Sequence, residues 1–120
     1  MKPARSLTGT AEIPLAAMEA RSTLKGVQLP LKRIAVSRCY RAEAGARGKA
    51  TQGLYRVHEF TKVEMFAWTL PDMELATKLF EEIVQLQVEI ISSLGLCGRV
   101  LEMPITDLGA SAMRKQDIEV

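Results

Sequence analysis

The sequence predicts an α+β fold, and three features of the chain predict it. Residues 31–43 and 54–68 alternate in side-chain type with the period of two that β-strands show. The glycine-rich stretch 44–53 between them lacks apolar periodicity, as a loop joining antiparallel strands does. Leucine and isoleucine then recur every three or four residues from Leu75 to Leu94, which indicates an amphipathic helix.

Residues 1–30 are expected to be irregular, because prolines and glycines interrupt this stretch repeatedly. The first strand is expected to run from Leu31 to Glu43. The loop 44–53 is longer than a tight hairpin needs, which is typical of a functional segment. Both strands carry one apolar face, and we expect the long helix to cover it. The members of that face are Ile34, Val36, Tyr40, Val57, Val63 and Met65.

The helix is expected to open at Pro71 and Asp72 and to end near Leu94, before Gly95. Residues 99–104 indicate a short strand, and 114–120 indicate another strand that begins as the chain stops. We therefore expect an incomplete sheet with exposed edges.

The charges are unevenly divided, although the net charge is only +2. Up to Arg56 there are eleven Lys or Arg against three Glu, and from Val57 onward five against eleven Asp or Glu. A basic first half suits a polyanion such as phosphate or nucleic acid. The acidic second half argues against a nucleic-acid coat over the whole surface.

Two other classes of protein are disfavoured. No run approaches the roughly 18 apolar residues of a membrane span, so we expect no membrane partner. Cys39 and Cys97 form no CxxC pair, and His58 is the single histidine, so we expect no metal site and no disulfide scaffold. A reducing compartment fits this cysteine usage.

The second face of the predicted hairpin combines cations, an aromatic ring and carboxylates. Its members are Arg41, Glu43, Arg56, His58, Phe60 and Glu64. Guanidinium groups bind phosphates, an aromatic ring stacks on a purine, and a carboxylate binds an ammonium group. Ion pairs on a solvated sheet are the alternative, so spacing alone leaves nucleotide binding open. A lone strand histidine is more often a structural or contact residue than a general base.

Three motifs carry a resemblance to a known family. CYRAEAGARG followed by GLYRVHEFTKVEMF resembles the second signature motif of class II aminoacyl-tRNA synthetases: an Arg-x-Glu strand, a loop and a Phe-bearing return strand. LTGTAEIPLA, residues 7–16, is similar to the Thr-Ala-Glu serine loop of seryl-tRNA synthetases, and KVE at 62–64 belongs to the same family. RVLEMP and RKQDIE look most like its mitochondrial, bacterial-type branch. The resemblance covers most of the chain.

The resemblance implies that residues 1–120 are part of the class II antiparallel sheet core, with the long helix packed on one face. It implies a partial catalytic domain that contains the serine loop and the second motif. The N-terminal tRNA-binding arm and the first and third motifs of the family are expected outside this chain. We therefore expect the isolated chain to be inactive, because aligned reactants supply much of the rate.

The resemblance also implies roles for individual residues. Arg41 and Arg56 would be catalytic: Arg41 would contact the α-phosphate and Arg56 the far end of the triphosphate of ATP. Phe60 would stack on the adenine. The whole implied ATP-binding set is Arg41, Ala42, Glu43, Arg56, Val57 and Phe60. Mg²⁺ is expected for the intact family enzyme, with its ligand outside this chain.

Serine would be bound through its ammonium and hydroxyl groups. The implied serine-binding set is Thr10, Ala11, Glu12 and Glu64. A pocket built to hydrogen-bond a hydroxyl rejects alanine, because its buried polar groups would otherwise stay unpaired.

The sequence departs from the family pattern at three positions. Gln52 stands where an arginine is usual, and Ala50 stands where an acidic residue is common. Both lie in the loop 44–53, which the resemblance places near the tRNA acceptor end, and they weaken its implied contacts. Glu59 replaces a more usual Gln or His.

Three functional hypotheses follow. The first is a serine–tRNA ligase that uses ATP, L-serine and tRNA(Ser), is a homodimer, and works in the mitochondrial matrix, with the cytoplasm as the alternative. The second is a truncated or noncatalytic relative that serves as a binding or regulatory module. The third, a synthetase for threonine or proline, is disfavoured by the serine loop and the KVE element.

Overall fold

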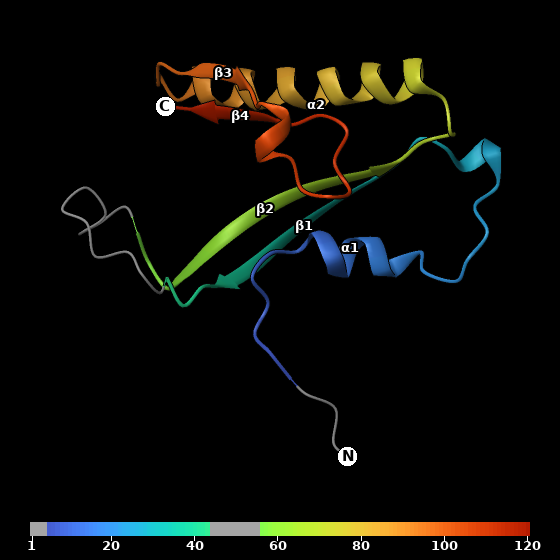
Figure 1. The fold of residues 1–120 in the computed structure, drawn as a ribbon, viewed down its shortest axis with the longest axis horizontal. Helices are drawn as coiled ribbons and strands as arrows, with labels where there is room; N and C mark the ends of the chain where they lie inside the picture. The colour runs from blue at the N-terminus through green and yellow to red at the C-terminus, as the bar shows by residue number, and fades with distance from the viewer. Residues whose placement is uncertain (1–4, 44–55) are drawn as a thin grey trace. The chain divides into compact units, whose positions relative to one another are not determined.

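The computed structural model describes residues 5–43 and 56–120, and the chain divides into two compact units after Leu70. Each unit combines one α-helix with one antiparallel pair of strands (Figure 1). The predicted α+β class is therefore confirmed. The predicted loop 44–53, with Ala50 and Gln52, lies outside the described residues.

The first unit is built on a long hairpin of β1 (Leu31–Tyr40) and β2 (Glu59–Trp68). The two strands have 10 residues each and pair antiparallel along their whole length. The prediction that the first strand reaches Glu43 is wrong. The Arg41 N–H still donates to the His58 carbonyl at 2.9 Å, but Glu43 has a φ of 49°, in the left-handed region that ends an extended strand.

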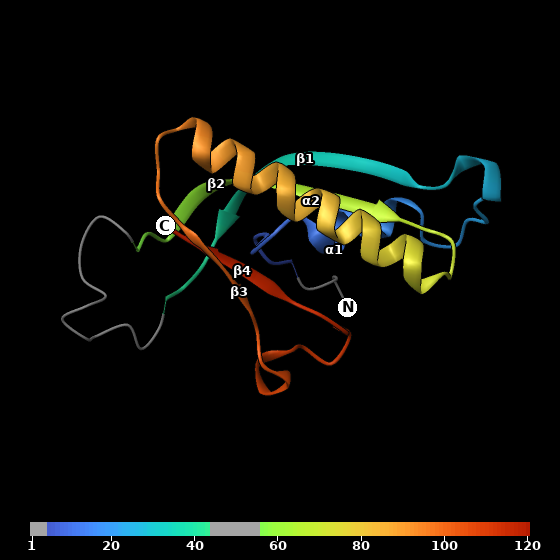
Figure 2. The same cartoon turned by 90° about the horizontal axis from the view of Figure 1, so that it is seen from above.

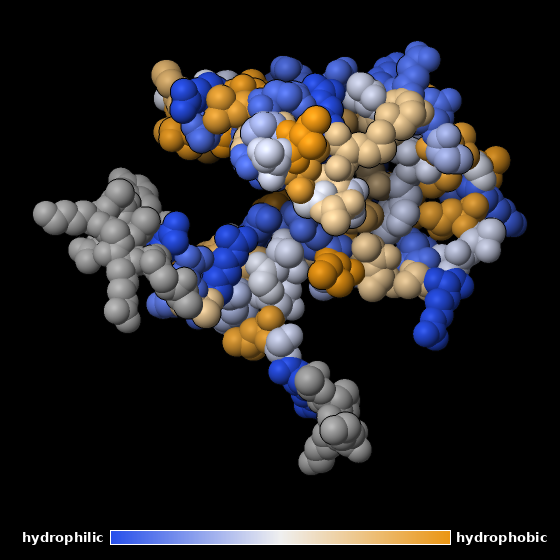
Figure 3. All heavy atoms as spheres, in the orientation of Figure 1, coloured by the Kyte–Doolittle hydropathy of each residue, from blue (hydrophilic) through white to orange (hydrophobic). Residues whose placement is uncertain are grey.

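The two faces of this hairpin differ in burial. The outer face carries Ile34, Val36 and Val63, which are 69%, 71% and 60% exposed. The inner face carries Cys39, which is wholly buried, and Glu64, which is 8% exposed. The apolar side chains of the hairpin are thus the more exposed ones, and the polar inner face is the buried one. Figure 3 shows apolar side chains, in orange, at the surface of the molecule beside polar ones.

The inner face is covered by the segment that precedes β1. The Thr8 carbonyl accepts from the Tyr40 N–H at 2.9 Å, which holds this segment against the end of β1. Helix α1 (Glu12–Met18) follows, with Ala11 at 3% and Leu15 at 4% exposure. Glu64 on the inner face is buried because this segment lies on it.

Helix α1 and the 3₁₀ turn η1 (Gly26–Gln28) correct the prediction that residues 1–30 are irregular. Pro14 does not interrupt α1, because it occupies the third helical position, where a backbone N–H has no partner inside the helix. A proline in the first turn is compatible with a helix.

In the second unit, α2 (Met73–Ser93) confirms the predicted long helix. The Asp72 carboxylate accepts hydrogen bonds from two first-turn N–H groups, at 2.9 and 3.0 Å, and caps the helix start. Gly95 follows the helix with a φ of 72°. Of the predicted apolar stripe, Leu79 is buried and Leu94 is 68% exposed. That this helix covers one face of the hairpin stays a prediction.

The second unit ends in the short hairpin of β3 (Arg99–Glu102) and β4 (Gln116–Glu119), which lie side by side in Figure 2. Both strands were predicted, but their pairing with each other was not. The 3₁₀ turn η3 (Ile105–Asp107) lies between them. Arg114 joins this hairpin to α2, since its guanidinium lies 5.0 Å from the ring centre of Phe80.

No helix in residues 5–43 and 56–120 combines the length and the apolar character that crossing a membrane requires.

Candidate functional site

A pocket of about 420 Å³ lies where β1 ends and β2 begins. Its volume is within the range of ligand-binding clefts. The side chains that line it are Arg41, Glu43, Arg56, Val57 and Phe60. The structure therefore brings together five members of the predicted ATP-binding set. The remaining member, Ala42, is exposed and lies between two of them in the chain.

The pocket places cations next to an aromatic ring. The Arg41 guanidinium carbon lies 5.0 Å from the centroid of the Phe60 ring, a cation–π distance. Arg56 Nη1 lies 3.0 Å from Glu43 Oε2, and the Arg56 side chain is 46% exposed. Such a pocket can hold a phosphate chain through two guanidinium groups and a planar base through the ring.

The backbone at the pocket is held in an unusual shape. Glu43 has a left-handed φ of 49°, which is uncommon for a side chain other than Gly, Asn or Asp. His58 steadies the same corner, because its Nδ1 lies 3.0 Å from the Arg41 carbonyl oxygen. A carbonyl oxygen only accepts hydrogen bonds, so Nδ1 carries the proton. This contact and the backbone angle of Glu43 fix where Arg41 and Glu43 leave the strand.

A second group of polar side chains lies on the inner face around Glu64. The Thr10 hydroxyl donates to Glu64 Oε1, and the Lys62 ammonium forms an ion pair with the same carboxylate. Burial raises the pKa of the Glu64 carboxyl. The hydrogen bonds from Lys62 and Thr10, with the charges of Lys62 and Arg41, outweigh burial and leave this pKa below its ordinary value. Glu64 is therefore ionised at neutral pH and can bind an ammonium group.

The predicted serine-binding residues are only partly brought together. Thr10 and Glu64 are in contact, and Ala11 is buried beside Thr10 at the start of α1. Glu12 is exposed on the first turn of α1, and the contacts seen in residues 5–43 and 56–120 do not join it to Glu64. Sequence reasoning gave Lys62 no role here, although its position two residues before Glu64 puts both side chains on one face.

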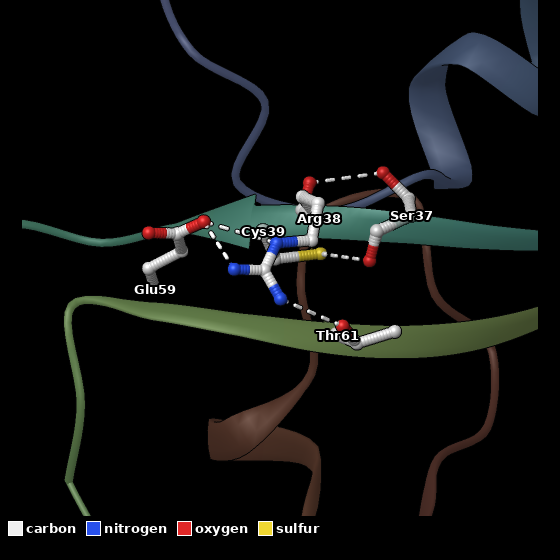
Figure 4. Close-up of polar contacts among 5 residues, drawn as sticks. All are labelled: Ser37, Arg38, Cys39, Glu59 and Thr61. Carbon is white, nitrogen blue, oxygen red and sulfur yellow. Dashed lines mark hydrogen bonds and ion pairs between the residues drawn. The ribbon is translucent and has the colours of Figure 1, made fainter.

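The outer face carries a different cluster, drawn in Figure 4. Arg38 Nε lies 2.9 Å from Glu59 Oε1, and Arg38 Nη1 lies 3.1 Å from Thr61 Oγ1. Glu59, which replaces the Gln or His usual in the family, has a structural role here. Its carboxylate accepts a hydrogen bond from the Arg38 guanidinium across the two strands. On the opposite, inner face, the Cys39 thiol contacts the Ser37 carbonyl at 3.8 Å. Arg38 is thus occupied within the hairpin and lies away from the pocket.

The sequence matches the family described as tRNA synthetase class II core domain (G, H, P, S and T) over residues 4–120. The match covers nearly the whole chain, so the chain belongs to this family. The class II resemblance drawn from the second-motif residues is confirmed.

Several relatives that match the chain are serine–tRNA ligases. It is 54% identical over 115 residues to the mitochondrial serine–tRNA ligase of Saccharomyces cerevisiae, covering 94% of this chain and 25% of that protein. It is 49% identical over 114 residues to the serine–tRNA ligase of the bacterium Rhodopirellula baltica, covering 95% of this chain and 26% of that protein. The chain thus spans about a quarter of the length of these relatives.

A solved structure is similar as well. The crystal structure of seryl-tRNA synthetase from Pyrococcus horikoshii complexed with ATP matches with a TM-score of 0.85 and 43% identity. The match covers 93% of this chain and 25% of that one. These comparisons confirm the serine branch of the resemblance and favour the ligase hypothesis over the noncatalytic module.

Proposed function

We propose that residues 1–120 are part of the catalytic domain of a serine–tRNA ligase. In the proposed reaction, a carboxylate oxygen of serine attacks the α-phosphorus of ATP, the bond to the β-phosphate breaks, and pyrophosphate leaves. A ribose hydroxyl of tRNA(Ser) then attacks the carbonyl of seryl-adenylate, and AMP leaves. The observation that carries the proposal is the pairing of Thr10 with the ionised Glu64 in the unit that also holds the Arg41–Phe60 pocket.

ATP is proposed to bind in the pocket. Arg41 would neutralise charge that develops on the α-phosphate, which is the main contribution a protein can make to phosphoryl chemistry. Arg56 would bind the far end of the triphosphate and exchange its ion pair with Glu43 for a phosphate. Phe60 would stack on the adenine, with Val57 and the backbone beside it. The ATP complex of the Pyrococcus horikoshii relative supports this nucleotide.

Serine is proposed to bind beside Glu64. The carboxylate would take the ammonium group, and the Thr10 hydroxyl with the backbone at Ala11 would help to hold the ligand. Glu12 would have to turn toward this site from its exposed position. Glu64 and Thr10 are hydrogen-bonded to each other before the ligand binds. A ligand with both an ammonium group and a hydroxyl can give each of them a new hydrogen-bond partner if that bond breaks.

Mg²⁺ is expected for the intact family enzyme, but the described side chains do not fit it. In residues 5–43 and 56–120, no three His, Cys, Asp or Glu side chains are grouped as a metal site would require. No step of the proposal therefore passes through a metal ion.

The partners and location of the whole protein are also proposals. We propose tRNA(Ser) as the second substrate, a homodimer as the assembly, and the mitochondrial matrix as the location. The mitochondrial relative from yeast supports the location, whereas the bacterial relative is equally compatible with a cytoplasmic enzyme.

The test is serine-dependent ATP–pyrophosphate exchange by the full-length protein that contains this chain. Arg41→Ala should reduce the exchange rate by about 10³-fold or more, the effect of removing an arginine that stabilises a phosphoryl transition state. Arg38→Ala is the matched control, because Arg38 lies on the outer face and should leave exchange within about twofold. Unchanged exchange in Arg41→Ala, or exchange that needs threonine or proline instead of serine, would contradict the proposal.

A further inference from the structure

Lys62 makes contacts that the proposed function does not yet use. Its ammonium pairs with the Glu64 carboxylate, and its Nζ lies 3.4 Å from the Thr10 hydroxyl oxygen. The Thr10 hydroxyl itself donates to Glu64, so the three side chains contact one another. The Glu64 side chain is 10% exposed, whereas that of Lys62 is 36% exposed. A nearly buried carboxylate is thus paired with a cation that reaches solvent.

We infer that Lys62 is a positioning residue of the amino acid site, which holds the Glu64 carboxylate ready for an incoming ammonium group and withdraws when that group binds. The inference rests on the proposed function, because it concerns the same carboxylate. Lys62 acts through Glu64 and does not itself touch the reacting atoms.

The first part of this role is to keep Glu64 charged. Burial favours the protonated carboxyl, and removing the cation from a buried ion pair leaves the remaining charge poorly compensated. The groups that face Glu64 and oppose burial are Lys62 on the same strand, Thr10 from the segment before α1, and the charge of Arg41. Without Lys62, only Thr10 and Arg41 would hold the pKa of Glu64 down.

The second part of the role is competition. The ligand's ammonium group and the Lys62 ammonium need the same carboxylate. Two cations bound to one carboxylate lie close together and repel each other. Lys62 can give way, because a lysine has a long flexible stem and this one already reaches solvent. Lys62 therefore helps binding by keeping Glu64 ionised and hinders it by occupying Glu64. The balance of the two effects depends on pH.

The two opposing effects of Lys62 predict a KM for serine that depends on pH when Lys62 is replaced. A residue with a purely structural role would not give this pH dependence. The KM for serine is measured in pyrophosphate exchange from pH 6 to pH 8.5, on the full-length protein and its Lys62→Gln and Lys62→Arg variants. In Lys62→Gln the KM should lie at or below the unaltered value at pH 8.5, because the competing cation is gone. It should then rise as the pH falls, and this rise should begin at a higher pH than in the unaltered protein, because Glu64 has lost one of the partners that hold its pKa down.

The unaltered protein and Lys62→Arg should keep the KM for serine constant within about twofold over the same range, because both retain a cation beside Glu64. The KM for ATP should not change. Lys78→Gln, the same substitution at an exposed position of α2, is the matched control and should behave like the unaltered protein.

A KM for serine that rises by one factor at every pH in Lys62→Gln would overturn the inference, and so would failure of Lys62→Arg to restore the profile. An unaltered protein without serine-dependent exchange overturns the proposed function first. Should Lys62→Gln fail to fold, the Glu64 carboxyl resonance of ¹³C-labelled unaltered protein decides the matter. It should titrate below the range of exposed glutamates, and titration at or above that range overturns the inference.

Discussion

The two faces of the β1–β2 hairpin each carry a cation paired with a glutamate, but the pairs differ in burial. On the outer face, the side chains of Arg38 and Glu59 are 60% and 47% exposed. On the inner face, the Glu64 side chain is 10% exposed and is also bonded to Thr10. Water screens the charges of the outer pair, so this pair contributes little to stability. The inner carboxylate has little water around it and depends on its protein partners.

The difference shows why similar residues at neighbouring positions have different roles. The outer pair links the two strands and leaves both groups solvated. The inner carboxylate exchanges most of its hydration for Lys62 and Thr10, so an ammonium ligand has to offer at least what these partners supply. Burial, and not the type of residue, distinguishes the inner face, where serine is proposed to bind.

The largest expected effect comes from neutralising the inner carboxylate. Glu64→Gln should lower kcat/KM for serine by about two to three orders of magnitude, because loss of one member of a desolvated charge pair costs roughly 2–5 kcal/mol. Pyrophosphate exchange with varied serine measures this loss in the full-length protein. Glu59→Gln on the outer face is the matched control and should change kcat/KM by less than about twofold. Similar losses in both variants would remove the distinction between the faces.

A smaller effect is expected on the pH dependence of stability. The lowered pKa of Glu64 stabilises the folded protein above the ordinary pKa of a glutamate, and this contribution is lost as the pH falls through the lower, folded value. Between pH 6 and pH 3 the unaltered protein should therefore lose stability relative to Glu64→Gln, because the variant has no carboxyl to protonate at this position. Urea denaturation over this range measures the difference. A gap that stays constant with pH contradicts the assignment.

The smallest effect is expected on the outer face. A double-mutant cycle of Arg38→Met and Glu59→Gln should give a coupling energy of about 0.2–1 kcal/mol, the range for exposed ion pairs. The coupling should shrink in 1 M salt, since the Debye length falls to roughly 3 Å. Denaturation of the four proteins measures it. A coupling above about 2 kcal/mol would show that solvent does not screen this pair and that the faces are alike.

Much of the fold could be predicted because its signals are local. Alternation predicted β1 and β2, and an aspartate cap with a glycine stop predicted α2. Helix α1 was missed because Pro14 was counted as a breaker, although its position in the first turn makes it harmless. The pairing of β3 with β4 was not predicted, since each strand has only four residues and so shows too short an alternation to indicate a partner.

The site could be predicted less completely than the fold. Arg41, Arg56 and Phe60 followed from the alternation and from the family resemblance, and the structure gathers them at one pocket. The burial of the polar inner face was not predicted, because apolar side chains normally mark the core and here Glu64 is buried while Ile34 is exposed. The Lys62 contact could not be foreseen, because the sequence does not show which partner a buried carboxylate takes.

The two cysteines differ in exposure, so their reactivity reports on opening of the structure. Cys39 is wholly buried and pairs in register with Phe60, whereas Cys97 is exposed. A maleimide dye will therefore modify Cys97 at once, but it can modify Cys39 only after the structure around the hairpin has opened. The delay between the two modifications times that opening without any engineered label.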